Sequence, residues 1–166
     1  MKLAVISDSH DNLLNLEKFL DWANKNQIEM IIHCGDLAAP SIIKKELAPK
    51  FTGPIHFIHG NVADRELNEK VAKEFKNVTL HGDQGELEID NRKIAFCHYL
   101  KQAEDLAQTK KFDLVFYGHD HQPWEKYIGQ TRLLNPGTLA GMFNKATFAV
   151  YDTESGQAQL ILLEKI

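Results

Sequence analysis

The sequence has few cysteines and no long hydrophobic run. Its two cysteines, Cys34 and Cys97, lie inside predicted strands, and so few cysteines favour a reducing, cytoplasmic setting over a disulfide-stapled secreted domain. No apolar stretch approaches the roughly 20 residues that a membrane-spanning helix needs. The run Leu3 to Ile6 is too short for a signal peptide and leads directly into Asp8. We therefore expect a cytoplasmic protein without a membrane segment.

The sequence also lacks an excess of positive charge. With 19 Lys and Arg against 23 Asp and Glu, the net charge is −4 at pH 7. This balance argues against binding of double-stranded nucleic acid over many phosphates, which needs a basic surface. No charge block, Pro/Gly/Ser tract or internal repeat marks a linker. Its 166 residues, 43% of them hydrophobic, are expected to form a single domain over residues 1–166.

Polar residues follow five apolar segments, each of which is a predicted β-strand: Lys2 to Ser7, Met30 to His33, Ile55 to His59, Ile94 to Cys97 and Leu114 to Tyr117. The loops that leave the carboxyl ends of strands in an open α/β sheet converge on one crevice. Nitrogen and oxygen donors there suit divalent transition metals and Mg²⁺ rather than a thiolate cluster. The sequence therefore predicts a metal site formed by Asp8, His10, Asp36, Asn61, His98, His119 and His121.

The remaining patterns alternate at first and then become rich in strands. Asp11 or Asn12 is expected to cap a first helix, and further helices are predicted over 40–47, 65–75 and 101–110. Strands are predicted over Val78–His81, Glu86–Ile89, Lys93–Cys97, Pro123–Ile128, Thr131–Leu134, Ala146–Tyr151 and Gln157–Leu163. So much strand with so few helices predicts an α/β (α+β) fold of two packed mixed β-sheets flanked by helices.

The order of these motifs resembles the calcineurin-like metallophosphoesterase superfamily, and in particular its small single-domain phosphodiesterases. The matching motifs are Asp8-Ser9-His10, Gly35-Asp36, Gly60-Asn61, His98 at a strand end, and Gly118-His119-Asp120-His121. A later segment, Asn135-Pro136-Gly137-Thr138, resembles a further loop of that family. Together these motifs extend over most of the chain.

The resemblance implies a binuclear phosphoesterase, with a metal-bridging hydroxide for in-line attack at phosphorus. Asp8, His10 and His121 would hold one divalent ion, Asn61, His98 and His119 the other, and Asp36 would bridge them. Manganese is the first expectation, with nickel, zinc, iron, cobalt or magnesium as alternatives. The catalytic set would be Asp36, Asn61, His98 and Asp64. Two ions, two carboxylates and one hydroxide would leave about one net positive charge, which suits a singly charged diester.

Three positions depart from the family pattern. Tyr99 follows His98 where glycine is common, so a bulky side chain is expected to shape the pocket. Val62 follows Asn61 where many phosphomonoesterases and protein phosphatases have a histidine that protonates the leaving group. Asp64 resembles an acidic residue of the small phosphodiesterases but lies one position later. These departures favour a phosphodiesterase acting on a small phosphate ester.

Several alternatives stay open. A retromer subunit with this fold serves mainly as an assembly surface, so a non-catalytic scaffold for protein partners is the alternative function. A structural metal site without turnover is a further alternative function. The oligomeric state is also open, with a homo-oligomer as one option. His33, His56, His59 and His81 hold no motif position and are expected to be structural or surface residues, although His33 or His59 could also reach the proton-donor position.

Overall fold

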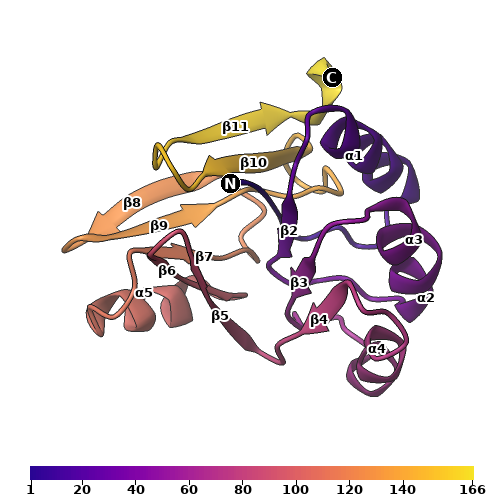
Figure 1. Cartoon of the computed structure of the whole chain (residues 1–166), viewed down its shortest axis with the longest axis horizontal. Helices are drawn as coiled ribbons and strands as arrows, with labels where there is room; N and C mark the ends of the chain where they lie inside the picture. The colour runs from indigo at the N-terminus through magenta and orange to yellow at the C-terminus, as the bar shows by residue number, and fades with distance from the viewer.

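The computed structural model describes all residues 1–166 and contains two mixed β-sheets (Figure 1). The first sheet comprises β1 (Lys2–Ile6), β2 (Met30–His33), β3 (Ile55–Phe57), β4 (Val78–Leu80), β10 (Thr147–Asp152) and β11 (Ala158–Leu162). The second comprises β5 (Gln84–Ile89), β6 (Arg92–Cys97), β7 (Leu114–Phe116), β8 (Trp124–Ile128) and β9 (Thr131–Asn135). Their strand orders are β11-β10-β1-β2-β3-β4 and β5-β6-β7-β9-β8.

Parallel pairing at the centre of each sheet brings the carboxyl ends of several strands to one edge. β1 to β4 run parallel, with Leu3 opposite Met30 in the first pair. β6, β7 and β9 also run parallel, whereas β10 and β11 in one sheet and β5 and β8 in the other are antiparallel to their neighbours. The prediction of two packed mixed sheets is therefore confirmed.

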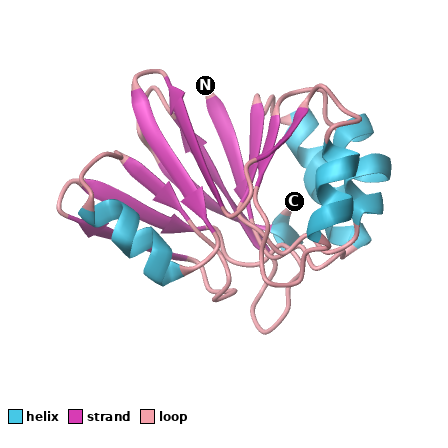
Figure 2. Ribbon diagram, turned by 90° about the horizontal axis from the view of Figure 1, so that it is seen from below, coloured by secondary structure: helices cyan, strands magenta, loops and turns pink.

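Helices cover both outer faces of the paired sheets, as Figure 2 shows. α1 (Leu13–Lys25), α2 (Pro40–Ile42), the π-helical turn η1 (Ile43–Leu47), α3 (Ala48–Lys50) and α4 (Arg65–Ala72) lie on the first sheet. α5 (Leu100–Gln108) packs on the second sheet, and a 3₁₀ turn, η2 (Leu163–Lys165), ends the chain. No helix is both long and apolar enough to cross a membrane.

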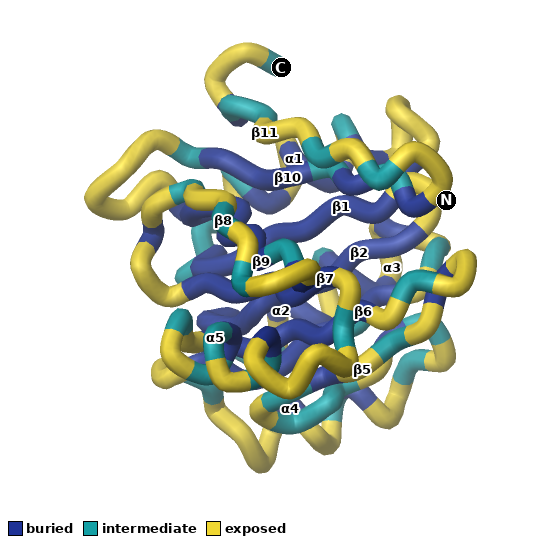
Figure 3. Tube along the Cα trace, turned by 90° about the vertical axis from the view of Figure 1, so that its left-hand side faces the viewer, coloured by how far each residue is buried: buried dark blue, intermediate teal, exposed yellow.

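The core explains why β1 is apolar along its whole length. Ala4 and Ile6 face the helices, while Leu3 and Val5 face the second sheet, and none of these four side chains is exposed. A strand buried on both faces needs a continuous apolar run rather than alternation. Figure 3 shows the central strands as the most buried part of the chain. The site residues thus follow strands that are held rigidly in the core.

One helix end needs correction, and the structure shows which of the two expected residues caps α1. The helix expected to end at Leu47 continues to Lys50. A π-helical turn, Ile43–Leu47, precedes Pro49, and its wider backbone relieves the clash between the proline ring and the preceding carbonyls. Of the two candidate caps of α1, Asn12 accepts the Asn15 N–H at 3.2 Å. Asp11 instead accepts the N–H groups of residues 38 and 39, at 3.1 Å and 2.9 Å, and fixes the loop after β2.

Candidate metal centre

The structure brings the predicted ligands together where the two sheets meet. Asp8 and His10 follow β1, Asp36 follows β2, Asn61 follows β3, His98 follows β6, and His119 and His121 follow β7. Three of these strands belong to the first sheet and two to the second. The site therefore joins loops from both sheets.

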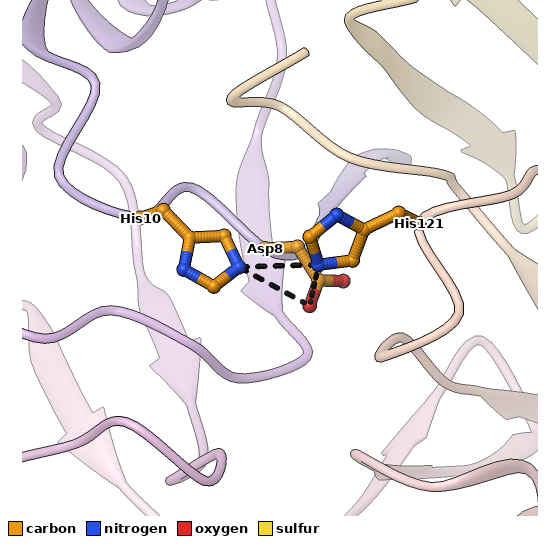
Figure 4. A group of neighbouring side chains, drawn as sticks. All are labelled: Asp8, His10 and His121. Atoms are coloured by element: carbon orange, nitrogen blue, oxygen red, sulfur yellow. Dashed lines mark hydrogen bonds and ion pairs between the residues drawn. The ribbon is translucent and has the colours of Figure 1, made fainter. Parts of the chain in front are cut away.

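Three of these side chains form one donor group (Figure 4). The Nε2 atoms of His10 and His121 lie 3.1 Å apart, and His121 Nε2 is 3.3 Å from Asp8 Oδ1. Asp8 is fully buried, yet its Oδ1 has no hydrogen-bond partner. A buried, unpartnered carboxylate oxygen facing two ring nitrogens is a poor arrangement without a cation, because such groups are normally hydrogen-bonded. The group therefore fits a divalent metal ion.

A second donor group lies on the other side of Asp36. Asn61 Oδ1 is 3.1 Å from His98 Nε2 and 3.1 Å from His119 Nδ1. His98 is buried, whereas Asn61 and His119 are exposed at the surface. This group therefore has an open side from which a ligand can reach it.

Asp36 connects the two groups. Its Oδ2 is 3.6 Å from His10 Nε2, and its Oδ1 is 3.5 Å from His98 Nε2, so each oxygen faces a different histidine. Burial alone would raise the pKa of Asp36, but the hydrogen bond and charge of His98 and the Val62 N–H outweigh it and lower the pKa to about 2. The carboxyl group is therefore ionised. A ligand atom of Asp8 also lies within 4.8 Å of ligand atoms of Asp36 and His98, so Asp8 is the alternative to Asp36 as the shared ligand.

Hydrogen bonds on the far side of two rings set which nitrogen faces the centre. His98 Nδ1 donates to the Cys34 carbonyl at 2.8 Å, and His121 Nδ1 donates to the Met142 carbonyl at 3.2 Å. A neutral ring that donates from Nδ1 has its Nε2 lone pair free for a metal ion, which is the usual arrangement behind a metal-bound histidine. Both Nε2 atoms point to the centre.

The backbone of the site is unusually strained. Five of the seven predicted ligands have positive φ, from 40° to 71°: Asp8, His10, Asp36, His119 and His121. Such conformations are uncommon outside glycine and concentrate at functional sites. Gly60 is needed for a different reason, because a Cβ there would lie 1.9 Å from Asp36 Oδ1. The strained turns aim side chains at one point, and Gly60 leaves room for the Asp36 carboxylate.

His33, which was expected to be a structural or surface residue, is a buried structural residue that supports the site. Its Nε2 donates to Ser9 Oγ at 3.0 Å, and its Nδ1 accepts the Gly35 N–H at 3.3 Å. Ser9 Oγ in turn donates to the Asp36 carbonyl at 3.4 Å. Burial lowers the pKa of His33 to about 3, so the ring is neutral. The signal in the sequence was its place directly before Cys34-Gly35-Asp36.

We expect His33→Phe to lower the free energy of unfolding by about 2–3 kcal/mol, because it leaves the buried Ser9 hydroxyl and Gly35 N–H without their partner. Urea denaturation of the single variants His33→Phe and Ser9→Ala and of the double variant measures the coupling between the two residues. The double variant should lose less stability than the sum of the singles. Strict additivity would contradict the described chain of hydrogen bonds.

The remaining sequence candidates lie outside the two donor groups. The Asp64 carboxylate accepts the Leu67 N–H at 3.2 Å and caps the N-terminus of α4. It makes no hydrogen bond to a predicted metal ligand. His59 is buried, and burial, with the nearby Arg65, lowers the pKa of its ring. His56 and His81 pair with each other at 2.9 Å.

The loop at Asn135-Pro136-Gly137-Thr138 holds the backbone of two turns that carry predicted ligands. Thr138 Oγ1 donates to the Asp8 carbonyl at 3.0 Å, and Asn135 Nδ2 donates to the Gly118 carbonyl at 3.1 Å. Each bond holds a turn that carries a predicted ligand, Asp8 on one side and His119 on the other. The Met142 carbonyl, which orients His121, left no signal in the sequence because any residue supplies a carbonyl.

Known proteins share both the sequence pattern and the fold. Phosphodiesterase MJ0936 of Methanocaldococcus jannaschii is 29% identical over 167 residues, which cover 99% of this chain and 100% of that protein. A solved structure of an archaeal phosphodiesterase has a TM-score of 0.89 at 27% identity, covering 98% of this chain and 99% of that one. Vps29 of Entamoeba histolytica, solved with Zn²⁺, has a TM-score of 0.70 at 16% identity, covering 98% and 99% of the two chains, and thus shares the fold.

The sequence model of the calcineurin-like phosphoesterase superfamily domain matches residues 1–156, which is nearly the whole chain. The match spans every motif on which the resemblance was based, from Asp8-Ser9-His10 to Gly118-His119-Asp120-His121 and the later loop. The strand-end position of those motifs agrees with it. The chain therefore belongs to the calcineurin-like phosphoesterase superfamily.

Proposed function

We propose that this protein is a metal-dependent phosphodiesterase with two divalent ions, manganese in the first place. Asp8, His10 and His121 would hold one ion, Asn61, His98 and His119 the other, and Asp36 would bridge them. The observation that carries the proposal is the position of Asp36, whose two oxygens face His10 and His98 at 3.6 Å and 3.5 Å. The phosphodiesterase activity named for the relatives supports the choice of substrate.

Paired divalent ions in such a site activate water and stabilise charge on the phosphoryl oxygens during in-line displacement. The contribution of the chain is to fix the donors before substrate binds. The Cys34 and Met142 carbonyls hold His98 and His121, and Thr138 holds the turn at Asp8. Preorganised groups of this kind need little rearrangement during the reaction.

None of the candidate general acids is positioned to protonate a poor leaving group. Val62 cannot donate a proton, and the Asp64 carboxylate is engaged at the N-terminus of α4. His33 is fully buried behind Ser9, and His59 is only 3% exposed. A general acid typically contributes about 10²- to 10⁴-fold, so its lack penalises esters with an alkoxide leaving group. We therefore infer a preference for diesters with a good leaving group.

With Mn²⁺ bound, we expect kcat/KM for bis-p-nitrophenyl phosphate to exceed that for a simple alkyl phosphate monoester by at least about 10²-fold, which is the lower bound of general acid catalysis. Matched aryl and alkyl mono- and diesters, assayed side by side on the metal-stripped and reloaded protein, measure this preference. A clear preference for alkyl monoesters would overturn the substrate assignment. No hydrolysis with any divalent metal would favour the scaffold alternative.

A further inference from the structure

Two exposed aromatic residues, Tyr99 and Phe143, lie next to histidines of the candidate metal centre. The Tyr99 ring lies 4.7 Å from the His119 ring and 5.0 Å from the His98 ring, both in an edge-to-face arrangement. The Phe143 ring lies 5.5 Å from the ring of His121. Tyr99 therefore borders one donor group, and Phe143 borders the other.

Phe143 is exposed to an extent that packing does not explain. The residue is 88% accessible, although burying a phenyl ring is normally favourable. Its backbone is also left-handed, with φ of 64°, which is a genuine outlier for a bulky residue. A strained, exposed aromatic residue beside a reactive centre points to a role in binding.

The segment before Phe143 is fixed to the site. The Ala140 N–H donates to the Asp8 carbonyl at 3.1 Å, and Asn12 Nδ2 donates to the Ala140 carbonyl at 3.0 Å. The Met142 carbonyl accepts from His121 at 3.2 Å. The backbone that carries the Phe143 ring is thus held next to the donor group of Asp8, His10 and His121.

Tyr99 is fixed in a comparable way beside the other donor group. It directly follows His98 and is the residue before the first turn of α5, where its carbonyl accepts the Ala103 N–H at 3.0 Å. The residue is 42% accessible, so the ring contacts the two histidines and part of it stays open. Each donor group thus has one partly open aromatic ring next to its histidines, Tyr99 beside His98 and His119 and Phe143 beside His121.

We propose that Tyr99 and Phe143 are specificity-determining residues, each contacting one planar ester group of a phosphodiester that carries planar groups on both arms. The proposal rests on the proposed function, since it places the phosphorus at the centre between the two donor groups. A diester has two organic arms, and aromatic side chains contact flat apolar groups well by offset or edge-to-face stacking. Aryl and nucleoside esters share this chemistry.

Three p-nitrophenyl diesters with one common leaving group test the proposal: the methyl, the phenyl and the thymidine 5′-ester. For the wild type with Mn²⁺ we expect a lower KM for the phenyl or thymidine ester than for the methyl ester. Phe143→Ala and Tyr99→Ala should each raise KM for the phenyl ester about 3- to 10-fold, the range of one aromatic contact. One of the two variants should leave KM for the methyl ester unchanged, because that ester has only one planar arm.

Control variants distinguish a lost contact with the substrate from a change in the fold or in metal binding. Tyr127→Ala removes an exposed ring on β8 and should leave all KM values unchanged. The conservative variants Phe143→Tyr and Tyr99→Phe should keep the low KM, and kcat, metal content and melting temperature should stay near wild type throughout. Equal KM for the three esters, or variants that do not distinguish them, would overturn the inference alone. No turnover of any ester would overturn the proposed function and this inference with it.

Discussion

Replacing Asp36 by Asn should lower kcat/KM for bis-p-nitrophenyl phosphate by roughly 10³-fold and reduce the bound Mn²⁺ from two ions per chain to one or none. Asparagine keeps the shape of the side chain but removes its charge and one of its two acceptor oxygens. The loss of charge stabilisation by metal in the transition state amounts to several kcal/mol, which corresponds to about three orders of magnitude in rate. We expect binding of both ions to weaken because one Asp36 oxygen faces His10 and the other faces His98.

Two further variants make this result specific. Asp83→Asn, which alters an exposed carboxylate paired with Arg65, should keep both the metal content and the rate. Asp8→Asn should weaken mainly the ion of His10 and His121. If Asp8→Asn removes both ions and Asp36→Asn removes only one, then Asp8 is the bridge. Full occupancy and full rate in Asp36→Asn would show that the assignment of Asp36 is wrong.

Removing the metal should lower the melting temperature by roughly 5–11 °C. A ligand that binds only the folded state adds about 2.7 kcal/mol of stability at 100 times its Kd, and each kcal/mol corresponds to roughly 2–4 °C for a chain of this size. Without a cation, the carboxylates of Asp8 and Asp36 repel each other, and Asp8 Oδ1 is buried without a partner. Burial, the largest influence, raises the pKa of Asp8, which shows how costly its negative charge is there.

Differential scanning calorimetry of the chelated, dialysed and reloaded protein measures this effect. Reloading with Mn²⁺ should restore the melting temperature, and the shift should be smaller in Asp36→Asn because fewer ions bind. An unchanged melting curve after verified metal removal would contradict the idea that the ions tie the two sheets together.

The sequence allowed the two sheets and the grouping of the ligands to be predicted because both depend on strong signals. An apolar run such as Leu3 to Ile6 predicts a buried strand, and parallel strands bring their carboxyl ends together. The exact ends of helices depend on weaker forces. The helix after Pro40 extends beyond Leu47 because a π-helical turn accommodates Pro49, and no periodicity of apolar residues encodes such a turn.

The residues that surround the predicted ligands were harder to predict than the ligands themselves. His33 contacts Ser9 and the Gly35 N–H only because β1 and β2 are neighbours, so its role depends on the packing of two strands. Asp64 lies one position later than an acidic residue of the family. Its carboxylate instead caps the N-terminus of α4. Phe143 had no motif, and its exposure and left-handed backbone are visible only in the structure.

The most direct test of the two-metal centre is anomalous scattering from crystals loaded with Mn²⁺. We expect two peaks per chain, close together, with Asp36 between them. One peak should lie beside Asp8, His10 and His121, and the other beside Asn61, His98 and His119. A single fully coordinated ion, or ions located away from these residues, would contradict the two-metal centre.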